Sequence, residues 1–367
     1  MEPVLPDYGG ACISRVVPAV LGMAPADWLP EPVQGAQAVV LLMLDGLGWQ
    51  ALREHPDALP TLAAMTGGPI TTVVPSTTAT ALTSLTTGLA PSRHGVTGFR
   101  IAMDGSVLNV LRWARADRRS PPDPLRLQRH AAFLGREVPV VTRAEYRNTG
   151  FTKVHLDGAP FLGWSAPSVL VERCRRLVGD GTRLVYAYYP GIDTVAHEFG
   201  LRDGYYAAEL ASADRLVADL LHALPAHVAL LVTSDHGQVH LDLDGWIGME
   251  PLADLVAVHS GDGRFRSLHA APGAAAELHR AAADHVGDRA WVRTRDELLD
   301  DGWFGADPTP ATRRRIGDVV VAAQGPVGFV DPRFTREAKL RSAHGSVTRE
   351  EMLVPLLARR GEERRGA

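Results

Sequence analysis

The sequence predicts an α/β protein with a mostly parallel central sheet, helices on both faces of that sheet, and a smaller cap subdomain inserted into the chain. Three continuous apolar runs, each leading to an acidic residue, indicate strands buried on both faces, as in a parallel sheet covered by helices. These runs are residues 38–46, 183–193 and 227–237. Residues 204–224 carry apolar side chains at helical spacing and lead directly into the third run, which predicts a helix-to-strand crossover.

The chain of 367 residues is long enough for one large α/β domain. We interpret residues 1–367 as a single domain. Within it, residues 240–340 are rich in Gly, Pro and Asp and contain short strand-like pieces, so we interpret them as a cap or inserted subdomain. Parts of residues 100–180, which mix Arg clusters with short apolar pieces, are expected to contribute to this cap. Residues 346–357 are predicted to form a final helix that returns to the core.

The composition excludes several classes of protein. Hydrophobic residues make up 46% of the chain and charged residues 22%, which is ordinary for a globular protein and unlike a disordered one. The net charge of −4 provides no basic footprint for a nucleic-acid partner. Cys12 and Cys174 supply neither a disulfide framework nor a cysteine zinc site. Without a signal-peptide pattern or an apolar run approaching about 18 residues, a cytoplasmic protein with no membrane contact is expected.

Acidic and imidazole side chains follow the three predicted strands. Asp45 closes the first strand, Asp193 follows the second, and Asp235 and His236 follow the third. Because ligands bind beyond the carboxyl ends of strands in open parallel sheets, these side chains are expected to meet at one edge. Each acid taken alone is equally compatible with a helix cap.

The strand-end residues also have the pattern of a metal site. Asp193 and His197 are four residues apart, which places both on one face of a helical turn. His344, in the sequence SAHG, precedes the predicted last helix. With the other strand-end residues they supply three carboxylates and three imidazoles, a mixed set that suits Zn²⁺ and related ions. Since a carboxylate cluster without cations would repel itself, two divalent metal ions about 3.5–4 Å apart are expected.

Residues 73–88, VVPSTTATALTSLTTG, are rich in hydroxyl side chains where an apolar strand ends. The run from Thr77 is predicted to form a helix that ends at Gly88. The unpaired backbone N–H groups of its first turn favour anions, and a metal can activate a hydroxyl there as a nucleophile. Thr78 is the preferred nucleophile, Thr77 competes with it, and Ser76 is expected to be the helix N-cap.

These motifs, in this order, resemble the alkaline phosphatase superfamily and, within it, the type I phosphodiesterase/nucleotide pyrophosphatase branch. The resemblance rests on Asp45, PSTTATALTSLTTG followed by PSRHG, YPGIDTVAHEFG, VTSDHG and AHG, and it spans residues 45–344. It implies a two-zinc site at which Thr78, rather than Thr77, forms a covalent phospho-threonine intermediate that water hydrolyses. The resemblance places Asp193, His197 and His344 on one metal and Asp45, Thr78, Asp235 and His236 on the other.

The expected function is therefore metal-dependent hydrolysis of a phosphodiester or pyrophosphate bond in a small molecule, a nucleotide being one option. One departure affects the substrate, because nucleotide pyrophosphatases have Asn three residues after the nucleophile and this chain has Ala81. A phosphomonoesterase or phosphonate hydrolase of the same superfamily is the first alternative. A phospho-group transferase and a non-catalytic metal-binding domain are alternatives of another class, and the intact set of seven metal-site residues argues against the latter.

A weaker motif has a structural alternative. Gly46, Gly48 and Ala51 fit the dinucleotide pattern G-x-G-x-x-A after a strand. Asp45 would repel a pyrophosphate at this position, so we favour a tight glycine turn that aims the Asp45 side chain.

Four other residues are interpreted without a catalytic role. His94, in the sequence PSRHG, is expected to be structural, and His240 is expected at the surface, within possible reach of a substrate. Tyr188 and Tyr189 are assigned to the core of the protein.

Overall fold

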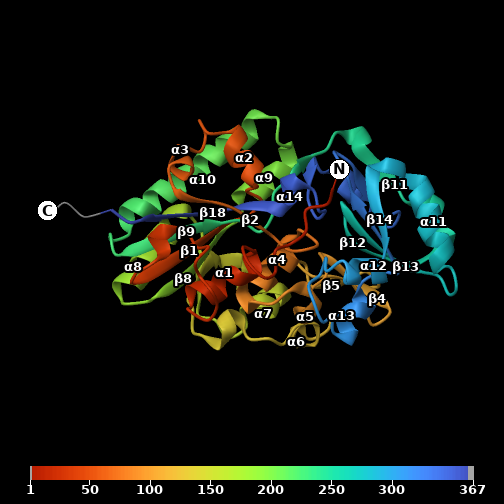
Figure 1. Ribbon diagram of the computed structural model, residues 1–367, viewed down its shortest axis with the longest axis horizontal. Helices are drawn as coiled ribbons and strands as arrows, with labels where there is room; N and C mark the ends of the chain where they lie inside the picture. Colours follow the sequence, from red (N-terminus) through yellow and green to blue (C-terminus); the bar gives the residue numbers. More distant parts are fainter. Residues whose placement is uncertain (1, 363–367) are drawn as a thin grey trace.

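A seven-stranded sheet crosses the centre of the computed structural model, which describes residues 2–362 (Figure 1). The strand order is β2-β18-β9-β1-β8-β6-β7. β1 is parallel to β8 and β9, and β6 is parallel to β7 and β8, whereas β18 runs antiparallel to β9 and β2. The mostly parallel sheet that the sequence predicts is thus confirmed. The strands are β1 (Ala38–Leu44), β2 (Thr66–Thr71), β6 (Val140–Arg143), β7 (Phe161–Trp164), β8 (Leu184–Tyr189), β9 (Val228–Thr233) and β18 (Leu353–Arg360).

The three predicted apolar runs form the three central strands, β9, β1 and β8, and every residue in them is buried. Their side chains alternate between two cores, so that Leu41 packs on one face of the sheet and Leu42 on the other. Burial of one such side chain stabilises the fold by about 1.5–3 kcal/mol, which explains why the runs are apolar at every position. One core includes α1 (Ile13–Val20), α4 (Thr78–Thr87) and α7 (Gly150–Leu156), and the other includes α8 (Pro167–Gly179) and α10 (Gly204–Ala223).

The helix predicted over residues 204–224 is α10, and it leads into β9 as expected. At 20 residues it is the longest helix in the described part of the chain. Within residues 2–362, no helix combines the length and the apolar character that crossing a bilayer requires.

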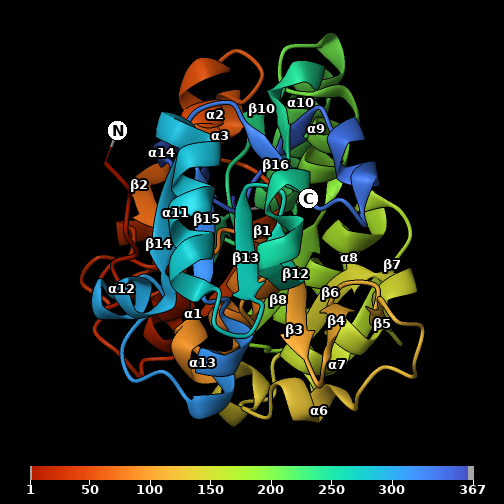
Figure 2. The same ribbon diagram turned by 90° about the vertical axis from the view of Figure 1, so that its right-hand side faces the viewer.

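A second, antiparallel sheet lies beside the main one, with the strand order β12-β13-β15-β14. α11 (Ala275–Val286) covers one of its faces, and Figure 2 shows this helix in front of the sheet. The other face shares an apolar cluster with Val74 and Val347, which lie on segments joined to the main sheet. The second sheet lies within residues 240–340, and its action as a cap is a proposal. Its strands are β12 (Val256–Asp262), β13 (Phe265–Ala270), β14 (Ala290–Thr294) and β15 (Val319–Ala323).

Residues 100–180 divide between two parts of the fold. Their first part forms a small sheet, in which β3 (Arg100–Met103) and β4 (Ser106–Asn109) are antiparallel and β5 (Ala114–Arg115) follows. β3 also contacts β12 of the second sheet. The later part supplies β6, β7 and α8 of the main layers, so most of residues 140–179 belong to the core of the main sheet.

The prediction of a final helix over residues 346–357 is wrong. The helix α14 covers only Arg349–Met352, and the chain then enters β18 between β9 and β2. Pro355 lacks the backbone N–H that a helix interior needs. The apolar run is buried on both faces, since Leu356 packs in one core and Leu357 in the other, which is the pattern of an internal strand.

Candidate active site

The predicted acids do converge at the carboxyl edge of the main sheet. Asp45 follows β1, Asp235 follows β9, and Asp193 lies in the first turn of α9 (Gly191–Phe199), the helix after β8. The loops are joined directly, because the backbone N–H of Asp193 donates to the carbonyl of Asp45 at 3.1 Å. The backbone N–H of Gly46 donates to Oδ1 of Asp235, also at 3.1 Å. The parallel topology therefore brings three carboxylates from distant segments to one place.

The turn after β1 depends on glycine. Gly46 has a φ of +81°, in the left-handed region that glycine favours. A Cβ atom added to it would lie 3.0 Å from both Cα and Cβ of Asp193. The close approach of this turn to α9 explains the glycine without any dinucleotide.

Asp193, His197 and His344 form a first cluster, in which one potential ligand atom from each side chain lies within 4.8 Å of the others. Nε2 of His197 is 3.3 Å and Nε2 of His344 is 3.7 Å from Oδ1 of Asp193. Nδ1 of His197 is bonded to the carbonyl of Ser342 at 2.8 Å, and Nδ1 of His344 to that of Ser76 at 2.9 Å. These bonds orient both rings so that Nε2 faces the cluster, as in metal-binding histidines.

Asp45, Asp193 and His236 form a second cluster within the same 4.8 Å limit. Nε2 of His236 lies 3.5 Å from Oδ1 of Asp45, 3.4 Å from Oδ2 of Asp235 and 3.1 Å from Oγ1 of Thr78. All seven residues named by the sequence are thus brought together. Asp193 lies in both clusters, whereas the resemblance assigns it to one metal only.

The charge balance of these clusters fits divalent cations. Oδ1 of Asp45 and Oδ2 of Asp235 are buried and have no hydrogen-bond partner within residues 2–362. Burial, followed by the charges of Asp235 and Asp193, raises the pKa of Asp45 well above its usual value. Burial, followed by the neighbouring imidazoles of His236 and His197, lowers the pKa of His344 well below its usual value. Orphaned carboxylate oxygens beside imidazole nitrogens are the donor set that Zn²⁺ and similar ions bind.

Thr78 is the first residue of α4, and its side chain is 8% exposed. Oγ1 of Thr77 instead interacts with Oγ1 of Thr80 at 3.1 Å. The expectation that Ser76 caps the helix is wrong. Thr77 is the N-cap residue, and the Ser76 hydroxyl donates to the carbonyl of Ser346, which lies 270 residues away in sequence. Of the adjacent hydroxyls, that of Thr78 faces the second cluster.

The other hydroxyls of α4 satisfy hydrogen bonds inside a buried helix. Thr83, Thr86 and Thr87 donate to carbonyls of the preceding turn, at 2.6–2.9 Å. The helix ends at Gly88, which has a φ of +71°, as predicted. Such back-bonding lets hydroxyl side chains occupy buried helical positions, so the Ser and Thr content of this segment is mostly structural.

Two residues that the sequence analysis did not connect to the site touch the clusters. The Tyr188 hydroxyl donates to Oδ2 of Asp45, so this tyrosine is more than a core residue. Nε2 of Gln238 donates to Oδ1 of Asp193 at 2.7 Å, while its Oε1 accepts from the Ser342 hydroxyl at 2.6 Å. The only sequence signal for Gln238 was its place two residues after His236.

The histidines expected outside the site lie outside both clusters. His94 is buried, with Nε2 2.8 Å from the Ser84 hydroxyl, and burial lowers its pKa to about 3. Nδ1 of His240 accepts from the backbone N–H of Leu201 at 3.1 Å. Ala81 is fully buried in the apolar core beneath α4.

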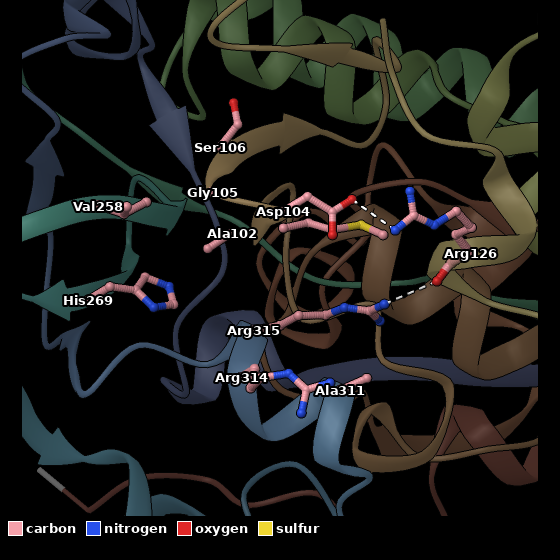
Figure 3. Close-up of a pocket in the computed structure, with 11 residues that line it drawn as sticks. Ala102, Asp104, Gly105, Ser106, Arg126, Val258, His269, Ala311, Arg314 and Arg315 are labelled. Carbon is pink, nitrogen blue, oxygen red and sulfur yellow. Dashed lines mark hydrogen bonds and ion pairs between the residues drawn. The ribbon is translucent and has the colours of Figure 1, made fainter. Parts of the chain in front are cut away.

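One cavity in the described residues lies away from the clusters. It has a volume of about 430 Å³ and lies between the β3–β4 hairpin, the second sheet and α13 (Pro310–Arg315) (Figure 3). Arg126 there pairs with Asp104 at 3.1 Å. A second cavity of about 380 Å³ reaches Gln238, behind the first cluster.

Comparisons with known proteins agree with this geometry. A family model described as type I phosphodiesterase/nucleotide pyrophosphatase matches residues 39–346. No curated protein sequence matches the chain. Among solved structures, the fold is similar to that of murine ectonucleotide pyrophosphatase/phosphodiesterase 5, in an inactive threonine-to-alanine form in complex with AMP. The TM-score is 0.67 and the sequence identity is 16%, over 88% of this chain and 87% of that one.

Phosphonoacetate hydrolase from Sinorhizobium meliloti 1021, in complex with phosphonoacetate, has a TM-score of 0.61 at 17% identity, over 90% of this chain and 92% of that one. At such low sequence identity, the two TM-scores establish a shared fold. The family match covers most of the chain and every residue of both clusters. The chain therefore belongs to the type I phosphodiesterase/nucleotide pyrophosphatase family of phosphoester hydrolases, within the alkaline phosphatase superfamily.

Proposed function

We propose that this protein hydrolyses a phosphodiester or pyrophosphate bond of a small molecule, with Thr78 as the nucleophile at a two-metal site. The observation that carries the proposal is the position of Oγ1 of Thr78, at the start of a buried helix and 3.1 Å from Nε2 of His236. The murine relative supports a threonine in this role, because its inactive form carries a threonine-to-alanine substitution and binds AMP.

The two clusters have the side chains to hold the metals. Asp193, His197 and His344 would bind one ion, and Zn²⁺ suits this set. Asp45, Thr78, Asp235 and His236 would bind the other, with Asp193 in contact with both clusters. When bound, such ions polarise the phosphoryl oxygens and lower the pKa of hydroxyl groups and water nearby.

The chain's own groups then act on the substrate. The Thr78 hydroxyl gives up its proton to solvent, and Oγ1 forms a bond to phosphorus while the bond to the leaving oxygen breaks. The leaving oxygen takes up a proton from solvent. The free N–H groups in the first turn of α4 face the charge that develops on the phosphoryl oxygens. Water then displaces Thr78 from phosphorus, which restores the hydroxyl and releases the phosphorylated product.

The substrate class is narrowed by Ala81, which is fully buried and supplies no polar contact. Backbone N–H groups would have to replace the Asn of the nucleotide pyrophosphatases. A phosphonate hydrolase is the second candidate, favoured by the fold similarity to phosphonoacetate hydrolase. A phosphomonoesterase is compatible with the same residues, and transfer to an acceptor alcohol would need an acceptor in place of water.

The first experiment is an assay of zinc-loaded wild type, Thr78→Ala and the matched control Thr77→Ala. The substrates are bis-p-nitrophenyl phosphate, p-nitrophenyl phosphate, a dinucleoside pyrophosphate and phosphonoacetate. Thr78→Ala is expected to lose activity by on the order of 10³-fold or more, as removal of a nucleophile does. Thr77→Ala should retain most activity, because its hydroxyl bonds to Thr80 and not to the cluster. Full activity in Thr78→Ala would exclude this nucleophile.

A further inference from the structure

A second group of buried polar atoms without partners lies where the second sheet meets β3. Three such atoms are Nη1 of Arg266, Nδ1 of His259 and Oδ2 of Asp331, none of which has a hydrogen-bond partner within residues 2–362. Their residues are at most 4% exposed, as is the neighbouring Arg100. Arg100 and Arg266 share one ion-pair partner, and both act, with Asp331, on the pKa of His259, so we treat these side chains as one cluster. Besides this cluster, the predicted metal site also gathers such atoms.

One carboxylate holds the two arginines of this cluster. Glu337 pairs with Nη2 of Arg100 through one oxygen and with Nη2 of Arg266 through the other. Arg266 is fixed further by the carbonyl of Phe329, to which its Nε donates at 2.9 Å. Glu337 lies in the short turn Thr335–Lys339, most of whose residues are exposed, and its own side chain is 16% exposed. Two desolvated guanidinium groups are thus held by one anion that comes from the surface.

A neighbouring ion pair shows what a fully satisfied arrangement looks like in this fold. Arg264, two residues before Arg266, makes a bidentate pair with Glu351 at 2.8 Å for both bonds. The remaining nitrogen of Arg264 donates to two backbone carbonyls, and Glu351 accepts from Ser346 and Thr348. No atom of this pair is left without a partner within residues 2–362, in contrast to Arg266.

The arginine cluster borders the predicted active site. The charges of Arg100 and Arg266 act to lower the pKa of Asp262, which lies at the end of β12. On its other side, a Cβ added to Gly345 would lie 3.3 Å from Cβ of Asp262 and 3.5 Å from Cγ2 of Thr77. The segment that carries Glu337 continues to Arg341, whose backbone N–H donates to the carbonyl of His197 at 2.9 Å. The two sites are therefore linked through the end of β12 and through residues 331–345.

We propose that Arg100 and Arg266 bind an anionic group of the substrate, a carboxylate or phosphate remote from the phosphorus that is attacked, and that Glu337 occupies this position until the substrate replaces it. Guanidinium groups bind such oxyanions through charge-assisted, often bidentate hydrogen bonds. Burial lowers the pKa of His259 to about 4, so its imidazole is neutral and can donate or accept a further bond. That the anion belongs to the substrate rests on the proposed function; anion binding by the arginines does not.

The test is a binding measurement in the Thr78→Ala background, in which the proposed function predicts no turnover. The probes are ω-phosphonocarboxylates of increasing chain length, with methylphosphonate as the probe that lacks the second anion. Glu337→Ala frees the arginines. The protein with this substitution is therefore expected to bind the phosphonocarboxylate of one particular chain length about tenfold more tightly than the parent with Glu337 does. Its affinity for methylphosphonate should be unchanged. Arg100→Gln should lose this preference for the carboxylate, and Thr335→Ala, an exposed neighbour, should not change it.

Three outcomes would overturn the proposal. If Glu337→Ala and the parent bind every carboxylate probe with equal affinity, the ion pairs of Glu337 only hold the turn Thr335–Lys339 in place. If Glu337→Ala binds methylphosphonate more tightly by the same factor as the carboxylate probes, removal of the Glu337 charge strengthens the binding of any anion. Acetate competing equally at every chain length would mean that the arginines bind a free anion and not part of the substrate. Product analysis of each binding sample checks that no probe is turned over, and the acetate measurement that follows does not depend on Thr78, so the two proposals fail separately.

A second measurement does not involve the metal site. If the arginines bind oxyanions, acetate at constant ionic strength should raise the melting temperature of Glu337→Ala by more than that of wild type, since it binds only the folded form. Arg100→Gln combined with Glu337→Ala should show no such rise. If acetate stabilises neither protein, or both equally, Glu337 has a structural role only.

Discussion

The carboxyl edge of the main sheet and the second sheet both bury charged side chains, but the two regions differ in how those charges are balanced. At the main-sheet edge, Asp45, Asp193 and Asp235 lie beside imidazoles, and two carboxylate oxygens lack partners within residues 2–362. In the second sheet, Arg264 and Arg266 are each paired with a glutamate of the same chain. The first arrangement leaves carboxylates without a counter-charge among the described residues, which supports the proposed metal site, whereas the second carries its own counter-charge.

The difference shows how an unsatisfied buried group can indicate a ligand. A buried charge costs several kcal/mol unless it is paired and hydrogen-bonded. Arg264 meets this requirement completely, the main-sheet carboxylates do not meet it, and the Arg100–Arg266 pair meets it only in part. Three predictions test this ranking.

Glu351→Ala is expected to cause the largest loss of stability. It would leave the fully buried Arg264 without a counter-charge, which costs about 3–5 kcal/mol. Glu337→Ala should cost less, because the Glu337 side chain is 16% exposed and solvent can replace it in part, whereas Glu351 is fully buried. Urea unfolding of both variants measures the difference. Equal losses would show that the two pairs have the same structural role, which would weaken the proposed anion site.

Gln238→Ala is expected to weaken metal binding about 10- to 100-fold, as loss of a group that orients a ligand does. Gln238 links Asp193 to Ser342, whose carbonyl in turn orients His197, so one substitution loosens two residues of the first cluster. Competition with a chelator measures zinc affinity directly. Gln50→Ala, which removes an exposed glutamine bonded to Glu54, is the control. Unchanged zinc affinity in Gln238→Ala would show that Gln238 does not support the metal site.

The residues that sequence analysis located share a local signal. β1, β8 and β9 are continuous apolar runs, and the acids that follow them can be placed at one edge by the parallel topology alone. Asp193 and His197 share a face of α9 because they are four residues apart. For these elements, a pattern within about ten residues determines both the structure and the direction of the side chain.

The residues that it missed depend on contacts between distant segments. Ser76 is drawn from its expected capping position by Ser346, and Gln238 is held by Ser342. The final apolar run forms a strand because it pairs with β9 on one side and with β2 on the other. No pattern within the run itself indicates these partners. In the same way, β3, β13 and a surface turn meet in the cluster of Arg100, Arg266 and Glu337, and their separate sequences look like ordinary surface charge.

The last prediction concerns the pH dependence of Asp262, which tests how far the arginines neutralise the second sheet. Burial raises the pKa of this carboxyl to about 7, against the opposing effects of the Phe99 N–H and of Arg100. Its value in the unfolded chain is near 3.9, so the folded protein holds the proton more tightly. The stabilisation from this group is therefore full below about pH 4 and is lost as the pH rises through 7.

Asp262→Asn removes this titration. The stability of wild type relative to the variant should therefore decrease between pH 5 and pH 7 and stay constant above about pH 8, as measured by urea unfolding of both proteins. A constant difference across this range would mean that Asp262 is ionised throughout. In that case Arg100 and Arg266 would already be neutralised by Asp262 as well as by Glu337, and an anionic group of the substrate would have little reason to bind between them.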